Sequence, residues 1–237
     1  AGACVSDIIK AGILPVAIEF MDRPCIRATE AFAKAGYPDC EALLIIEVEG
    51  SQAEIAEQLA RIKTIALTHN PVEFREAEDE DQAKRIWLGR KSAFGAMGQI
   101  NDYMCLDGTV PVSELPYTLK RIGELSKQHG LDVANVFHAG DGNMHPLILF
   151  DANEPGEQEK AEAFGFDILR TCVDVGGCLT GEHGVGVEKR DLMTYQFNAD
   201  DLEGQMQVKD VFDPTWLLNP SKVFPLQVSA QRRAGRS

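Results

Sequence analysis

The stretch LDVANVFHAGDGNMHPLILF, residues 131–150, does more than any other part of the chain to decide the fold. Two apolar runs, 131–138 and 146–150, flank a short polar segment, and their Val, Ile and Phe residues favour strands. The Asp-Gly and Gly-Asn pairs of residues 141–143 tolerate the positive φ angles of a tight reversal. The sequence therefore predicts two strands joined by a tight loop, with His138 ending the first strand and His145 beginning the second.

The same alternation of extended and helical patterns continues on both sides of this pair. Apolar runs of strand length occur at residues 13–20, 42–49 and 103–110. Amphipathic segments of helical length occur at residues 26–35, 51–68, 78–98 and 157–176. Strand–helix–strand units with antiparallel pairs are typical of an α+β fold. We expect a ferredoxin-like sandwich with a largely antiparallel sheet and helices packed on one face.

The last part of the chain has a different character. Two short helices are predicted near residues 188–195 and 200–212, so a helical segment follows the sheet. Residues 1–226 are then expected to form one domain. The arginine-rich end, residues 227–237, is predicted to be a disordered tail.

Composition excludes several classes of function. Lys plus Arg number 23 and Asp plus Glu 37, so the formal net charge is −14. Such a surface repels nucleic-acid phosphates and anionic membranes, and no apolar run is long enough to cross a bilayer. The 6 cysteines form no C-x-x-C pair, which favours reduced thiols in a cytosolic protein. We therefore expect a cytoplasmic, acidic globular protein that does not bind nucleic acid.

A second polar motif, TGEHGVG at residues 180–186, adds Glu182 and His183 to the two histidines above. Taken singly, each motif has an ordinary explanation, because a histidine at a strand end is usually structural and a glycine-rich turn usually only turns. Two histidines and one glutamate with open positions are, however, a common catalytic metal set. The clustering of these side chains with glycines favours a divalent metal site.

Three other short motifs are ambiguous. Arg90, in Gly-Arg-Lys at residues 89–91, is either a solvated surface cation or a clamp for a substrate carboxylate. The Asp-Gly-Thr sequence at residues 107–109 follows a predicted strand and is interpreted as a turn. Asn219-Pro220 also has the pattern of a simple turn.

Together the motifs resemble a known family. The set comprises HAGDGNMHP at 138–146, GEHGVG at 181–186 and LNP at 218–220, with GRKSAF at 89–94 and YMCLDGT at 103–109. It is similar to the C-terminal domain of FAD-linked oxidases of the vanillyl-alcohol-oxidase type, in the branch of D-2-hydroxyacid dehydrogenases such as glycolate oxidase and D-lactate dehydrogenase. The resemblance extends from Ile8 to Pro225. It departs from the family at Ser221, where the family often has Gly.

The resemblance implies a role for each matching residue. The implied metal ligands are His138, His145 and Glu182, with zinc, manganese or iron as the ion. The implied catalytic base is His183, the implied substrate-binding residues are Arg90 and Asn143, and the implied flavin contact is Asn219. Nothing in this sequence resembles the family's FAD-binding domain, so the resemblance implies that this N-terminal domain is missing here and binds most of the FAD.

The implied activity is FAD-dependent oxidation of a small 2-hydroxy acid to the 2-oxo acid. The stretch 103–107 supplies no second cation for a dicarboxylate, which favours glycolate or D-lactate. Implied partners are the FAD domain and other oxidase subunits, including an iron–sulfur subunit that could hold the protein at the membrane periphery. Two alternatives remain open: a non-catalytic metal- or ligand-binding or subunit-contact module, and a flavin-independent metallohydrolase.

Overall fold

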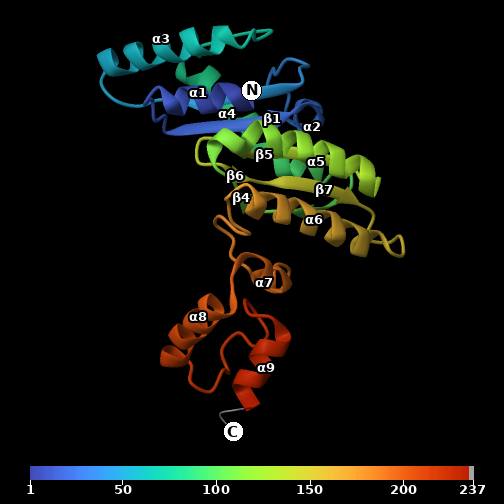
Figure 1. The fold of residues 1–237 in the computed structure, drawn as a ribbon. Helices are drawn as coiled ribbons and strands as arrows, with labels where there is room; N and C mark the ends of the chain where they lie inside the picture. Colours follow the sequence, from blue (N-terminus) through green and yellow to red (C-terminus); the bar gives the residue numbers. More distant parts are fainter. Residues whose placement is uncertain (235–237) are drawn as a thin grey trace.

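A computed structural model describes residues 1–234 of the protein (Figure 1). The strands are β1 Ala17–Asp22, β2 Ala42–Glu47, β3 Asp102–Cys105, β4 Gly108–Thr109, β5 Val133–His138, β6 Asn143–Met144 and β7 Pro146–Phe150. The helices are α1 Gly2–Lys10, α2 Arg23–Ala33, α3 Gln52–Thr68, α4 Glu80–Met97, α5 Leu115–His129, α6 Glu157–Asp174, α7 Met193–Gln196, α8 Ala199–Phe212 and α9 Leu226–Ala234, with 3-10 turns at Val112–Glu114 and Arg190–Leu192.

The strands form one antiparallel sheet. Its order is β2-β1-β5-β6-β4, and β7 pairs with both β5 and β3. Strands β6 and β7 are separated only by His145, and β3 and β4 only by residues 106–107. Because β4 pairs with β6 and β3 pairs with β7, these two interruptions lie beside each other. Regular strand pairing is thus interrupted at two adjacent places. Side chains at these interruptions are available to form a site.

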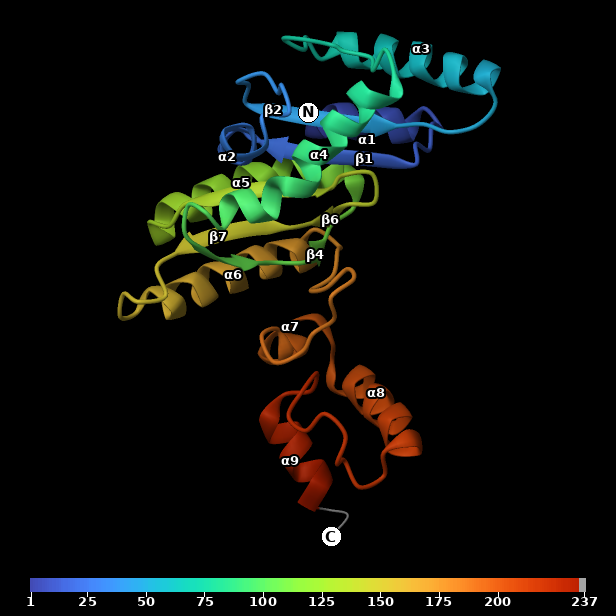
Figure 2. The same ribbon diagram turned by 180° about the vertical axis from the view of Figure 1, so that it is seen from behind.

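Helices cover both faces of the sheet. Phe20 of β1 and Phe137 of β5 stack with ring centroids 4.8 Å apart in the core beneath α1, α5 and α6. Their neighbours Met21 and Val136 belong to a second core beneath α2 and α4. In Figure 1 helices α5 and α6 lie before the sheet, and in Figure 2, from behind, α4 lies before it.

The predicted α+β fold with an antiparallel sheet is confirmed, but the prediction that helices pack on one face is wrong. The reason lies in the central strands. All four inner residues of both β1 and β5 are buried, so each strand is shielded on two sides. A strand of this kind needs a layer of helices on each face.

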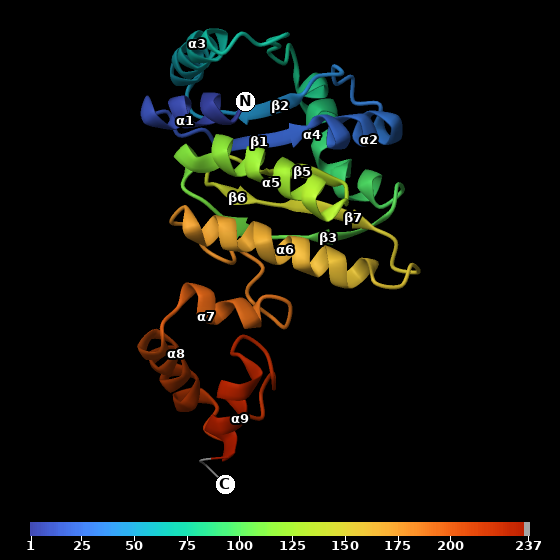
Figure 3. The same ribbon diagram turned by 45° about the vertical axis from the view of Figure 1, so that its right-hand side comes forward.

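The C-terminal segment projects from the sheet (Figure 3). Helix α7 and Leu202 of α8 pack against the main core, whereas the rest of α8, α9 and the intervening loop surround a small cluster of Met206, Trp216 and Phe224. Disorder was expected from residue 227, but α9 extends to residue 234. Arg232 forms ion pairs with Glu203 and Asp210 of α8, which hold α9 in place. The rest of the expected tail, 235–237, lies outside the described residues.

Candidate active and metal site

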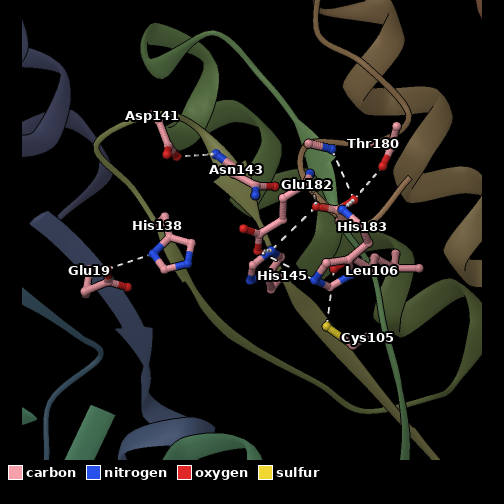
Figure 4. Close-up of polar contacts among 12 residues, drawn as sticks. Glu19, Cys105, Leu106, His138, Asp141, Asn143, His145, Thr180, Glu182 and His183 are labelled. Carbon is pink, nitrogen blue, oxygen red and sulfur yellow. Dashed lines mark hydrogen bonds and ion pairs between the residues drawn. The ribbon is translucent and has the colours of Figure 1, made fainter. Parts of the chain in front are cut away.

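The candidate site lies where the two strand interruptions meet (Figure 4). His145 occupies the gap between β6 and β7, and Asp107 lies in the gap between β3 and β4. The segment after α6 is brought alongside β4 by two hydrogen bonds between the backbones of Thr109 and Cys178, at 3.0 and 3.1 Å. This pairing carries the second motif, residues 180–186, over the two gaps.

His138 and His145, at the two ends of the tight loop, lie close together. His138, the last residue of β5, pairs in register with Asn143 of β6. The tight reversal between them places Gly142 at a φ of 77°, in the left-handed region that favours glycine. The two imidazole rings lie edge to face, with centroids 5.5 Å apart.

The second motif places its two polar side chains against His145. The His183 ring stacks on His145 with centroids 5.2 Å apart and an interplanar angle of 17°. Oε1 of Glu182 lies 3.2 Å from Nε2 of His145 and 3.6 Å from Nε2 of His183. These three residues and Asp107 each offer a ligand atom within 4.8 Å of the others. His138 lies beside this group without belonging to it, so two of the three predicted ligands are members.

Asp107, which was interpreted as part of a turn, is the centre of the hydrogen bonding at the site. Its side chain is fully buried. Its oxygens accept hydrogen bonds from the Thr180 hydroxyl (2.6 Å), the backbone N–H groups of Gly181 (3.1 Å), Glu182 (3.1 Å) and His183 (3.0 Å), and Lys189 Nζ (3.0 Å). Burial alone would raise the pKa of this carboxyl, but these donors, led by Thr180, hold the pKa well below its ordinary value. Asp107 is therefore ionised at neutral pH.

His145 has the properties of a metal ligand that is ready to bind. It is 3% exposed, and its Nε2 makes no hydrogen bond to any described residue. Burial lowers the pKa of His145, although the nearby Glu182 opposes this shift, so the ring is neutral at pH 7. Nε2 of His145 and Oε1 of Glu182 face each other at 3.2 Å without a hydrogen bond between them. A divalent cation resolves such a contact, and imidazole with carboxylate suits zinc, manganese or iron.

Arg90 and His138 share a carboxylate that sequence analysis missed, that of Glu19. Nδ1 of His138 lies 2.8 Å from Glu19 Oε1, while Glu19 Oε2 lies 2.9 Å from Nε and 2.8 Å from Nη2 of Arg90. The Glu19 and Arg90 side chains are both buried. Arg90 is thus paired within the chain, and its Nη1 makes no hydrogen bond or ion pair with a described residue. A charge inside the apolar strand β1 was the signal that could have revealed Glu19.

The two predicted asparagines lie in different places. Asn143 is buried at the site, its Oδ1 has no hydrogen-bond partner among the described residues, and a Cβ added to Gly181 would collide with it. Asn219 is exposed in the loop between α8 and α9, with a φ of 46°. No hydrogen bond or ion pair of the described residues joins Asn219 to the histidines.

The charges around the site nearly cancel. Lys189 neutralises Asp107, and Arg90 neutralises Glu19. Glu182 has only histidine partners, at 3.2 and 3.6 Å. The site therefore keeps one carboxylate without a permanently charged partner, which attracts a metal cation and repels an organic anion.

Known proteins resemble the chain in sequence and in fold. It is 52% identical over 227 residues to glycolate oxidase subunit GlcD of Escherichia coli, covering 95% of this chain and 46% of that protein. It is 29% identical over 236 residues to the mitochondrial D-lactate dehydrogenase [cytochrome] of Kluyveromyces lactis, covering 95% of this chain and 40% of that protein. The chain thus spans about half the length of the curated relatives it matches.

A solved structure shows the same fold. Substrate-bound p-cresol methylhydroxylase superposes with a TM-score of 0.68 at 14% identity, over 95% of this chain and 51% of that one. Within residues 1–234, no helix is both long and apolar enough to cross a membrane. The family described as FAD linked oxidases, C-terminal domain, matches residues 1–223. Because this match includes both histidine motifs and all but the end of the chain, the protein belongs to the FAD linked oxidase family and carries its C-terminal domain.

Proposed function

We propose that the chain is the substrate- and metal-binding half of an FAD-dependent enzyme that oxidises a small 2-hydroxy acid, glycolate or D-lactate, to the 2-oxo acid. The family and the two named relatives support this activity. The observation that carries the proposal is the buried Nε2 of His145 facing the Glu182 carboxylate at 3.2 Å. Neither the non-catalytic module nor the metallohydrolase is favoured by these comparisons.

The proposed metal ligands are His138, His145 and Glu182. Their nitrogen and oxygen donors fit a divalent ion, which would supply Lewis-acid polarisation of the substrate hydroxyl. Electrostatics also favour this arrangement. An anionic 2-hydroxy acid would be repelled by Glu182 alone, and a cation beside that carboxylate makes the site attractive to the substrate.

His183 is the proposed base for the hydroxyl proton. Its side chain is 51% exposed, so substrate can reach it, and its ring is oriented by stacking on His145. Histidine suits proton transfer near neutral pH. We place the substrate carboxylate at Nη1 of Arg90, with Asn143 lining the same site. FAD supplies the acceptor for the Cα hydride, and Asn219 is the proposed contact of this chain with it.

The proposed partners are the FAD-binding half of the same protein and an iron–sulfur subunit as the next electron carrier. The relative from Escherichia coli is named as a subunit of glycolate oxidase, which supports a multisubunit enzyme.

The test compares His183→Ala and Arg90→Lys in the enzyme that contains both halves. We expect His183→Ala to lower kcat about 100-fold with the metal retained, since general-base catalysis contributes at least this much. Arg90→Lys keeps a cation beside Glu19 but removes the Nη1 group, so it should instead raise KM, because the substrate-carboxylate contact exists before and during the reaction. His129→Ala is the matched control, since His129 pairs with Asp167 on the far helices α5 and α6. Near-normal turnover of metal-replete His183→Ala enzyme would exclude His183 as the base.

A further inference from the structure

Glu19 is an unusual residue for its position in the sheet. It is 4% exposed and lies in the middle of β1. Strand alternation places it on the same side as Met21, which belongs to the apolar core beneath α2 and α4. A carboxylate in such surroundings is costly to bury unless both of its oxygens are paired. Its presence there therefore calls for a reason beyond packing.

Both oxygens of Glu19 have partners from distant parts of the chain. Arg90, 71 residues away on α4, donates to Oε2. His138, 119 residues away, contacts Oε1 through Nδ1 and lies directly opposite Glu19 in the β1–β5 register. Figure 4 shows His138 between Glu19 and the His145 cluster. The three side chains form a line of contacts, Arg90 to Glu19 to His138, that ends at the candidate metal site.

This contact determines which nitrogen of His138 carries the proton. An ionised carboxylate can only accept hydrogen bonds, so the neutral imidazole must donate from Nδ1. The lone pair then lies on Nε2, at the opposite side of the ring. Histidines that bind metals are commonly oriented in this way, by a carboxylate on the nitrogen that does not bind the metal.

Neutralising Arg90 does not by itself explain the arrangement. Arg90 contacts only Oε2 of Glu19, through both Nε and Nη2, so the ion pair uses one oxygen. The other oxygen, Oε1, contacts His138 at the end of β5. We propose that Glu19, held by Arg90, is a positioning residue that fixes the Nδ1–H form of His138 and directs its Nε2 lone pair towards the metal. This inference rests on the metal site of the proposed function.

The experiment replaces both charges at once, in Glu19→Met/Arg90→Met, so that neither partner stays buried without its counterion. Two properties are measured in the wild type and the variant. Long-range ¹H–¹⁵N spectra, recorded about two pH units above the ordinary histidine pKa, show which nitrogen of His138 carries the proton. The visible absorption bands of Co²⁺ give its dissociation constant. With 5 histidines in the chain, a His138→Gln spectrum identifies the signal. Asp167→Asn is the matched control, since it removes the carboxylate 2.9 Å from Nε2 of the distant His129.

We expect the double variant to lose the fixed Nδ1 proton and to bind Co²⁺ about 10- to 100-fold more weakly, as when other supporting partners of metal ligands are lost. Asp167→Asn should change neither quantity. A folded double variant with the wild-type proton position or the wild-type Co²⁺ affinity overturns the role of Glu19. A wild-type chain that binds no Co²⁺ overturns the metal site itself, which is a separate and recognisable result.

Discussion

Two buried carboxylates support the site, and they do so in different ways. Asp107 accepts hydrogen bonds from three consecutive backbone N–H groups, those of residues 181–183. Glu19 contacts two side chains, His138 and Arg90. Each carboxylate also has its own buried cation, Lys189 for Asp107 and Arg90 for Glu19. Asp107 thus anchors the main chain of residues 181–183, and Glu19 orients the imidazole ring of His138.

The difference follows from the backbone of each region. His138 ends a strand whose main chain is already paired with β1 and β6, so only its ring remains to be oriented. Glu182 and His183 lie in a loop that belongs to no strand or helix, followed by Gly184 and Gly186 at φ angles of 84° and 56°. Such a loop has backbone donors that no ladder satisfies, and a buried carboxylate serves them instead. Main-chain support is needed where secondary structure is absent.

Asp107→Ala tests this contrast between the two carboxylates, and we expect it to cause the largest loss of unfolding free energy. The substitution removes the acceptor of three loop N–H groups and leaves Lys189 buried without its counterion. Breaking a buried ion pair in this way costs about 3–5 kcal/mol of unfolding free energy. Urea denaturation measures the loss. Glu19→Met/Arg90→Met, which removes a whole pair, is the comparison and should lose less; an equal loss in the two proteins would remove the distinction between the two carboxylates.

Gly181→Ala should lower the unfolding free energy by less, and only by disturbing the loop that contacts Asp107. The added Cβ would meet Oδ1 of Asn143 and the Thr109 side chain, so the loop must shift off its contacts with Asp107. Overpacking of this kind costs about 1–3 kcal/mol of unfolding free energy. Gly95→Ala on α4 is the matched control, because a Cβ there meets nothing within 4 Å. It should be neutral or stabilising by up to about 1 kcal/mol. A Gly181→Ala protein as stable as Gly95→Ala would show that the loop is not tightly held.

The smallest change in stability is expected from lowering the pH. The folded-state pKa of Asp107 lies well below its ordinary value of 3.8, where its unfolded-state pKa is expected. Its contribution to stability is therefore fully present above about pH 5 and is lost as pH falls through 3.8 towards the folded-state pKa. The stability difference between wild type and Asp107→Asn should stay constant from pH 7 to about 5 and shrink below about pH 4. A difference that grows in acid would contradict a lowered pKa.

Sequence patterns predicted the parts of the molecule that are local. The strands on either side of residues 139–142, and His138 and His145 at their facing ends, follow from a short stretch of chain, and both are observed. Asp107 and Glu19 were missed because their roles depend on partners far along the chain, which periodicity cannot show. The second helical layer was missed for a related reason, since an apolar strand does not indicate on which face a helix will pack. The roles proposed for Arg90, Asn143, His183 and Asn219 remain predictions.

The long sequence separations within the site have a consequence for folding kinetics. Glu19 and His138 are 119 residues apart, and Asp107 and Glu182 are 75 residues apart. Contacts between residues so distant in sequence form only after large loops have closed, and the complete site, which needs both contacts at once, is expected only in the native state. Interactions absent from the transition state act on the unfolding rate. A ligand bound at this site should therefore slow unfolding and leave the refolding rate nearly unchanged.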